Sequence, residues 1–171
     1  AKFSWEKLNW INSQYIKNME SRKLSEIVLK YWGNMGWEPP SQEWAIKLIN
    51  LIKESMTLLK DAIDQSKPFF LLPPIEKEGQ DFLEKNNGQS SLKLVLNYLI
   101  DQNTVKLDKE KGKKIIDEIS KKHNLKKGTL MKSLRVAFFG SLSGPDLIQS
   151  WELFSENKSD ISRIERCLKS I

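Results

Sequence analysis

Apolar residues recur along most of the chain at intervals of three and four, the spacing that gathers side chains on one face of an α-helix. The first such segment runs from Ser4 to Ile16, and Ser4 is its predicted N-cap. A second N-cap, Ser41, opens a pattern that continues to Ile63 and predicts the longest helix of the chain. Further helices are predicted over residues 23–31, 76–84, 90–100, 108–122 and 126–140, with a new helix starting near Pro145.

The segment from Asn103 to Leu107 is the only strand-like stretch, and it is too short to form a sheet alone. The pattern therefore predicts an all-α fold. Between Pro68 and Pro74 the prolines remove backbone donors and favour extended geometry in their neighbours. We expect a joint there between two helical subdomains, residues 1–75 and 76–171.

Composition restricts the class of protein. With 171 residues and 39% hydrophobic content, the chain can bury a core. The single cysteine, Cys167, cannot form an internal disulfide, and no Cys/His cluster offers a metal site, so we expect a reduced, cytoplasmic setting. No apolar run approaches the roughly 20 residues of a membrane span. The start lacks the apolar core of a signal peptide, and its lack of methionine suggests a piece of a longer protein.

The net charge of +6 is concentrated in one segment. Residues 106–135 hold eleven Lys or Arg against four acidic residues, an excess of +7, so the remainder of the chain carries −1. Such a patch is expected for binding a polyanion, because each neutralised phosphate releases counterions. A solvated lysine-rich helix face explains the same charge equally well.

Groups for an enzymatic reaction are few. His123 ends a lysine-rich helix, where the helix dipole is a sufficient reason for it. The neighbouring carboxylates Asp117 and Glu118 diverge around a helix, and no glycine-rich phosphate loop is present. Cys167 has no nearby base in sequence and is expected to pack. We therefore expect no catalytic residue, metal or cofactor in this chain.

Residues 126–147 hold the most informative pattern: a basic helix start, an apolar body that contains Arg135, a stop at Gly140 and a Ser/Gly/Pro loop. A buried guanidinium costs several kcal/mol unless it is paired, so Arg135 should meet a carboxylate or emerge toward a ligand rich in acceptors. Glycine permits close backbone approach, and unpaired bases stack on guanidinium or apolar surfaces. The segment suits single-stranded RNA.

The same segment resembles the C-terminal region of bacterial-type glutamyl-tRNA synthetases. There a Lys-Lys-Gly start leads to a Leu-Arg-Val-Ala helix, a glycine turn and a Gly/Thr-Pro-x-Leu helix start, matched here by residues 126–147. The opening stretch from Lys2 to Ile16 is similar to the segment that follows the catalytic domain of that family. The resemblance implies the separated helical C-terminal part, containing the anticodon-binding domain.

The resemblance also implies residue roles. Arg135 would read the middle anticodon base, and the loop with Gly144, Pro145 and Leu147 would surround the third. The structural alternatives are a salt bridge from Arg135 to Asp146 or Glu152, and a mere helix start at Gly144-Pro145. Phosphates would be held by five lysines of the basic segment: Lys113, Lys114, Lys126, Lys127 and Lys132.

One departure from the family concerns the first anticodon base. Members that accept only the glutamate tRNA commonly carry an arginine there, and this chain has Ser55 at that position. We therefore expect tRNA(Glu) as partner, with tRNA(Gln) as a second candidate, and a monomer that works with its own catalytic domain.

The adenylation motifs of the family, a His-Ile-Gly-His-like stretch and a Lys-Met-Ser-Lys-Ser-like loop, are missing from the sequence. The chain alone should not aminoacylate tRNA, and ATP and magnesium would belong to the catalytic domain. Two alternatives remain open on the residues alone. One is a helical protein-interaction module without RNA specificity, and the other is the helical cage of a class I lysyl-tRNA synthetase.

Overall fold

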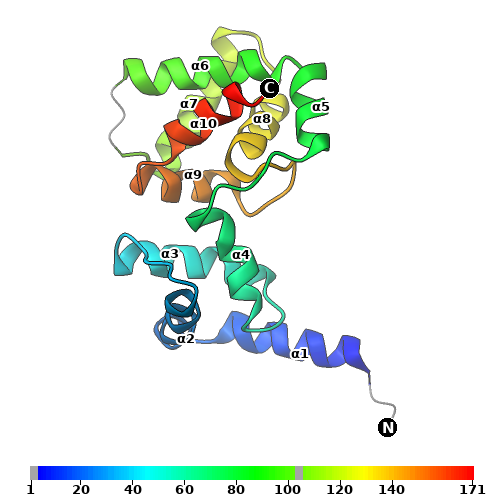
Figure 1. Ribbon diagram of the computed structural model, residues 1–171, viewed down its shortest axis with the longest axis vertical. Coiled ribbons are helices and arrows are strands. Elements are labelled where there is room, and N and C mark those ends of the chain that lie inside the picture. Colours follow the sequence, from blue (N-terminus) through cyan, green and yellow to red (C-terminus); the bar gives the residue numbers. More distant parts are fainter. Residues whose placement is uncertain (1–3, 103–105) are drawn as a thin grey trace. The chain divides into compact units, whose positions relative to one another are not determined.

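The computed structural model describes residues 4–102 and 106–171. Within them all regular structure is helical, which confirms the all-α prediction (Figure 1). Most of the predicted strand, Asn103 to Val105, lies outside the described residues. The chain divides into two compact units, residues 1–71 and 72–171, where the sequence-based boundary was placed after residue 75.

The elements of the first unit are α1 (Trp5–Asn18), α2 (Ser21–Asn34), α3 (Gln42–Ile52), the 3-10 helix η1 (Lys53–Ser55) and α4 (Asp61–Phe70). Three of its helices, α2, α3 and α4, contribute rings to an aromatic cluster. The predicted caps are confirmed, because Ser4 Oγ accepts from the Lys7 amide at 3.3 Å and Ser41 Oγ from the Trp44 amide at 3.1 Å.

Trp32 lies at the centre of this aromatic cluster. Its ring meets those of Trp44 and Phe70 edge-on, with centroids 6.5 and 5.0 Å away. Its indole N–H donates to Ser66 Oγ at 2.9 Å, so the one polar atom of the buried ring is satisfied. Fully buried tryptophans of this kind contribute about 3 to 5 kcal/mol each to stability.

The prediction of one long helix from Ser41 to Ile63 is wrong, since α3 ends at Ile52. After the short turn of η1 the backbone becomes extended at Met56, whose side chain is completely buried. Asp61 Oδ2 then accepts from the amides of Thr57 and Leu58, at 3.0 and 2.8 Å. The apolar spacing continues through the break because Met56 fills the core without being helical.

The expectation that Pro68 lies outside regular helix is also wrong. Pro68 is the eighth of the ten residues of α4, and the helix continues to Phe70. Proline removes only one backbone donor at this position. The Leu71 amide donates to Lys67 O at 2.9 Å and completes the last turn, and the Phe69 side chain of that turn is buried. Extended backbone begins at Leu71, where the first unit ends.

The second unit is built around α8, which packs against all five of the other helices of this unit. These helices are α5 (Lys77–Lys85), α6 (Gly88–Asp101), α7 (Lys109–Lys122), α8 (Lys127–Phe139), α9 (Leu147–Glu156) and α10 (Asp160–Lys169). The predicted cap Asp108 accepts from the Lys111 amide at 2.8 Å. Phe138 of α8 meets Trp151 and Phe154 of α9, with centroids 6.0 and 5.2 Å apart.

A buried carboxylic acid joins α9 to α10. The indole N–H of Trp151 donates to Asp160 Oδ2 at 3.2 Å, and Asp160 is only 7% exposed. Burial raises the pKa of Asp160 above its ordinary value, and this outweighs the hydrogen bonds that favour the charged form. A group with a raised pKa contributes stability at low pH, and that contribution is lost as the pH rises through the raised value.

Candidate nucleic-acid interface

Arg135 lies near the C-terminal end of α8 and is half-buried. Its neighbours Leu134 and Val136 are fully buried, so the helix backbone that carries the guanidinium is fixed by the core. Nη1 donates to the carbonyl of Pro145 at 2.7 Å. The structure thus gives the guanidinium a backbone partner, where the sequence suggested a carboxylate or a ligand. A guanidinium has five donors, so the other edge of the fork can serve a second acceptor.

The loop between α8 and α9, residues 140–146, is held at both ends. Gly140 ends α8 with φ 71°, and its N–H returns to Val136 O at 2.8 Å. At the far end Asp146 caps α9, since its Oδ1 accepts from the Gln149 amide at 2.9 Å. The helix restart predicted near Pro145 is therefore confirmed.

The structure brings Arg135, Gly144 and Pro145 together at one corner. Gly144 is exposed, and a Cβ on it would lie 3.1 to 3.4 Å from the Phe139 ring, so the backbone rests on that ring. Leu147, by contrast, is only 1% exposed. Its side chain packs inside the unit, so a role at the interface would consist of supporting the loop.

Ser55 lies in the other unit, at the end of η1. Its hydroxyl donates to Ile52 O at 3.0 Å and also bonds the side-chain oxygen of Gln65. The side-chain amide nitrogen of Gln65, Nε2, donates to the backbone carbonyl of Ser55 at 3.2 Å. The side chain that stands where an arginine is expected is exposed but already engaged within its own turn.

The five candidate phosphate lysines are all exposed, and three of them face carboxylates of α7. The pairs are Lys113 with Glu110 at 3.5 Å, Lys114 with Glu118 at 3.7 Å and Lys127 with Asp117 at 2.5 Å. The bond from Lys127 lowers the pKa of Asp117.

Lys126 and Lys132 differ from these three. Neither has a carboxylate within 4.0 Å in the described part of the chain, and the Lys132 ammonium lies 5.6 Å from the centroid of the Phe82 ring. Exposed pairs are weak, so phosphates can compete for all five lysines, but Lys126 and Lys132 have no pair to give up.

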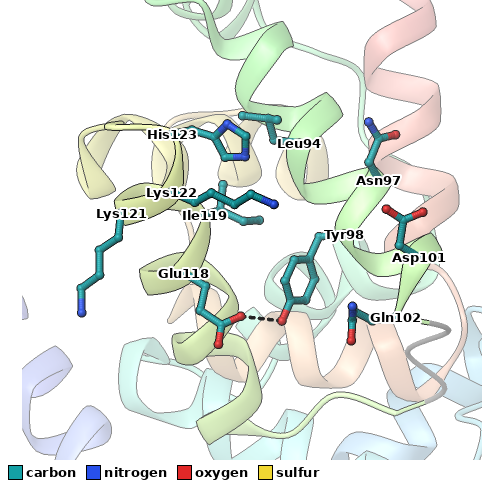
Figure 2. Close-up of a pocket in the computed structure, with 10 residues that line it drawn as sticks. All are labelled: Leu94, Asn97, Tyr98, Asp101, Gln102, Glu118, Ile119, Lys121, Lys122 and His123. Atoms are coloured by element: carbon teal, nitrogen blue, oxygen red, sulfur yellow. Dashed lines mark hydrogen bonds between the residues drawn. The ribbon is translucent and has the colours of Figure 1, made fainter.

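A pocket of about 640 Å³ lies apart from this corner, between the C-terminal ends of α6 and α7 (Figure 2). Tyr98 OH donates to Glu118 Oε2 across it at 2.7 Å, and this bond is the main reason that the pKa of Tyr98 is raised. Lys122 extends over the pocket while Lys121 points away from it. None of the candidate base-reading residues is among those that line it.

Two arginines of α10 donate to backbone carbonyls of the second unit, and neither is among the functional residues predicted from the sequence. Arg163 Nη1 donates to Phe138 O at 2.8 Å, and its guanidinium lies over the Phe154 ring, 4.1 Å from the centroid. Burial lowers the pKa of Arg163 to about 10. Arg166 Nη1 donates to Pro73 O at 2.7 Å. The available signal was their spacing of three, which puts them on the same helix face as buried Cys167.

Side chains that could bind a metal do not gather in the described residues. No group of three or more His, Cys, Asp or Glu side chains there could hold a metal ion. Cys167 is completely buried, and burial raises its pKa to about 11, so the thiolate is scarce at neutral pH. No helix among the described residues has both the length and the apolar character needed to cross a membrane.

An all-helical chain that presents an arginine, a Gly-Pro corner and a row of exposed lysines has the features of a helical RNA-binding module. The family model of the anticodon binding domain matches residues 23–168, and the chain belongs to this family.

Relatives agree with this family. The chain is 84% identical over all 171 residues to a glutamate–tRNA ligase of Prochlorococcus marinus strain MIT 9312, and 45% identical over 168 residues to that of strain NATL1A. It spans 36% and 35% of those two proteins, about a third of their length. A crystal structure of a glutamate tRNA ligase from Elizabethkingia meningosepticum matches 99% of this chain and 33% of its own, with a TM-score of 0.87 and 26% identity.

The glutamyl-tRNA synthetase resemblance is thereby confirmed. The comparisons favour anticodon binding over the protein-interaction module and over the lysyl-tRNA synthetase cage.

Proposed function

We propose that this chain binds the anticodon loop of tRNA(Glu) as the recognition part of a glutamate–tRNA ligase. The match of the anticodon binding domain to residues 23–168 carries the proposal, and the names of the relatives supply the amino acid. In the longer protein a separate catalytic domain would attach glutamate with ATP and magnesium. We propose that this chain alone is inactive and that the whole protein is a cytoplasmic monomer.

The proposed mechanism divides the work between two kinds of side chain. Lys113, Lys114, Lys126, Lys127 and Lys132 hold phosphates and set the orientation of the RNA, without distinguishing sequences. Arg135 tests the middle anticodon base with the donors that Pro145 O leaves unused, and the exposed Gly144 and half-buried Pro145 adjoin the third base. Because Arg135 is half-buried, the effective dielectric constant around its guanidinium is lower than that of water, and its hydrogen bonds are correspondingly stronger.

The test is a filter-binding titration against anticodon stem-loops for glutamate, glutamine and lysine, each at two salt concentrations. We expect the glutamate stem-loop to bind at least about tenfold more tightly than the lysine one, with a steep loss of affinity at higher salt. Equal and salt-insensitive binding of all three would contradict the proposal. The glutamine stem-loop tests the consequence of Ser55, since tight binding to it would mean that both tRNAs are accepted.

A lysine substitution separates phosphate binding from base reading. Lys126→Ala should weaken every stem-loop by a similar factor and reduce the slope of log affinity against log salt by about 1. Lys23→Ala, which removes an equally exposed charge from α2 outside the basic segment, is the matched control and should leave the slope nearly unchanged. A change in the ratio between glutamate and lysine stem-loops would show that Lys126 contacts a base.

A further inference from the structure

Residues 72–76, which we call the strap, run without regular structure into α5 and are tied to the end of α8. The Glu76 amide donates to Gly140 O at 2.8 Å. Three residues earlier, Pro73 O accepts from Arg166 Nη1 at 2.7 Å. Both bonds lie within the second unit and join residues far apart in the sequence.

Contact between the strap and Gly140 is unusually close. A Cβ built on Gly140 would lie 2.0 Å from Pro74 O and 3.3 Å from Ile75 Cα. Next in α5, a Cβ on Gly79 would lie 3.2 Å from Gly140 O. Only a residue without a side chain permits this approach, so the position of the strap and that of Gly140 determine each other.

Gly140 is also where the candidate base-reading loop begins. The loop extends to Asp146, and its far end is bound by Arg135 through Pro145 O. A displacement at Gly140 would therefore move the segment that presents Pro145, and with it the acceptor that orients the Arg135 guanidinium. From outside α8, the strap contacts Gly140 itself, and the bond from Arg163 to Phe138 O holds the helix two residues earlier.

The guanidinium of Arg166 is partly removed from water without full hydrogen bonding. Its Nε and Nη2 atoms are buried and have no hydrogen-bond partner among the described residues, while Nη1 has Pro73 O. Removing two nitrogens of a guanidinium from water without giving them hydrogen-bond partners is destabilising, and the bond from Nη1 offsets only part of that cost. That one bond satisfies a carbonyl of the strap.

We propose that Arg166 is a positioning residue for base reading: it holds the strap on Gly140 and so fixes the loop that orients Arg135. The inference rests on the proposed function. It predicts that Arg166 affects discrimination between bases although it contacts none of them. Residues that only stabilise the fold would weaken all RNAs alike or not at all.

The test uses three variants of the full chain. Arg166→Gln removes the charge and shortens the donor, and Arg166→Lys keeps a charged donor. Lys169→Gln is the matched control, because it removes one exposed charge from the same helix, one turn further along.

The first measurement is hydrogen exchange of the Glu76 amide without RNA. We expect Arg166→Gln to speed this exchange about tenfold while amides in the middle of α8 stay protected. Arg166→Lys should lie between this variant and the unaltered chain, and Lys169→Gln should leave the exchange unchanged. Unchanged Glu76 exchange in Arg166→Gln would overturn the proposal.

The second measurement compares the glutamate stem-loop with one that carries a changed middle base. Arg166→Gln should weaken binding of the first about five- to tenfold, which is about 1 to 1.4 kcal/mol. It should leave the affinity for the second and the salt slope nearly unchanged. Equal weakening of both RNAs would overturn a positioning role. If the unaltered chain does not distinguish them, the proposed function fails, while the exchange of Glu76 still decides whether Arg166 holds the strap.

Discussion

Replacing Arg135 with alanine is expected to weaken binding of the glutamate anticodon stem-loop by about 1 to 3 kcal/mol. The loss would follow from removal of the proposed guanidinium–base contact from a half-buried corner, where water cannot fully replace it. A stem-loop with a changed middle base lacks this contact from the start, so its affinity should fall by less than about 0.5 kcal/mol. Titration of both RNAs at one salt concentration measures the difference.

The bond from Arg135 to Pro145 O complicates this variant, because alanine also releases the loop. Arg135→Lys is the appropriate control, since it keeps the charge and one donor but loses the planar fork. If the fork reads the base, lysine should restore little of the discrimination. If Arg135 only tethers the loop or neutralises a phosphate, lysine should restore most of the affinity, and alanine should weaken both RNAs equally.

The helices could be predicted because their determinants are local. Ser4, Ser41 and Asp108 each accept a hydrogen bond from an amide three residues ahead, so a cap can be recognised in a few letters of sequence. The break after Ile52 could not, because Met56 keeps its place in the apolar pattern although its backbone is extended. Pro68 stays within α4 since tertiary packing of Phe69 outweighs one lost donor.

The same distinction applies to the candidate site. Arg135 and Pro145 are ten residues apart, within one helix–loop motif that the sequence predicts, although Pro145 O was not among the partners expected for Arg135. Arg166 and Pro73 are 93 residues apart, and nothing in either segment indicates the other.

The charge count identifies the basic segment, residues 106–135, but it does not show which of its lysines lie beside carboxylates. Three of the five candidate lysines lie beside carboxylates of α7, and one of these pairs, Lys127 with Asp117, joins two helices. An excess of +7 in sequence is thus a surface of mixed charge in the fold. Its affinity for phosphate depends on how readily weak pairs are exchanged.

Gly140→Ala is expected to lower the free energy of unfolding by about 2 to 5 kcal/mol. Alanine at φ 71° costs about 1 to 2 kcal/mol in backbone strain, and its Cβ would overlap Pro74 O, a backbone atom that can move only with the strap. Relief of such overlap typically costs a further 1 to 3 kcal/mol. Urea unfolding monitored by far-UV circular dichroism gives the free energy from the midpoint and slope.

Gly128→Ala is the matched control because Gly128 lies in the first turn of the same helix and a Cβ there meets nothing within 4 Å. Alanine is the better helix former, so this variant should be unchanged or more stable by up to about 1 kcal/mol. Opposite signs at the two ends of α8 would show that Gly140 is required by contact with the strap and by its left-handed backbone. A Gly140→Ala protein as stable as the Gly128→Ala protein would mean that the strap can leave α8 at little cost, and the loop would then have no fixed beginning from which to orient Arg135.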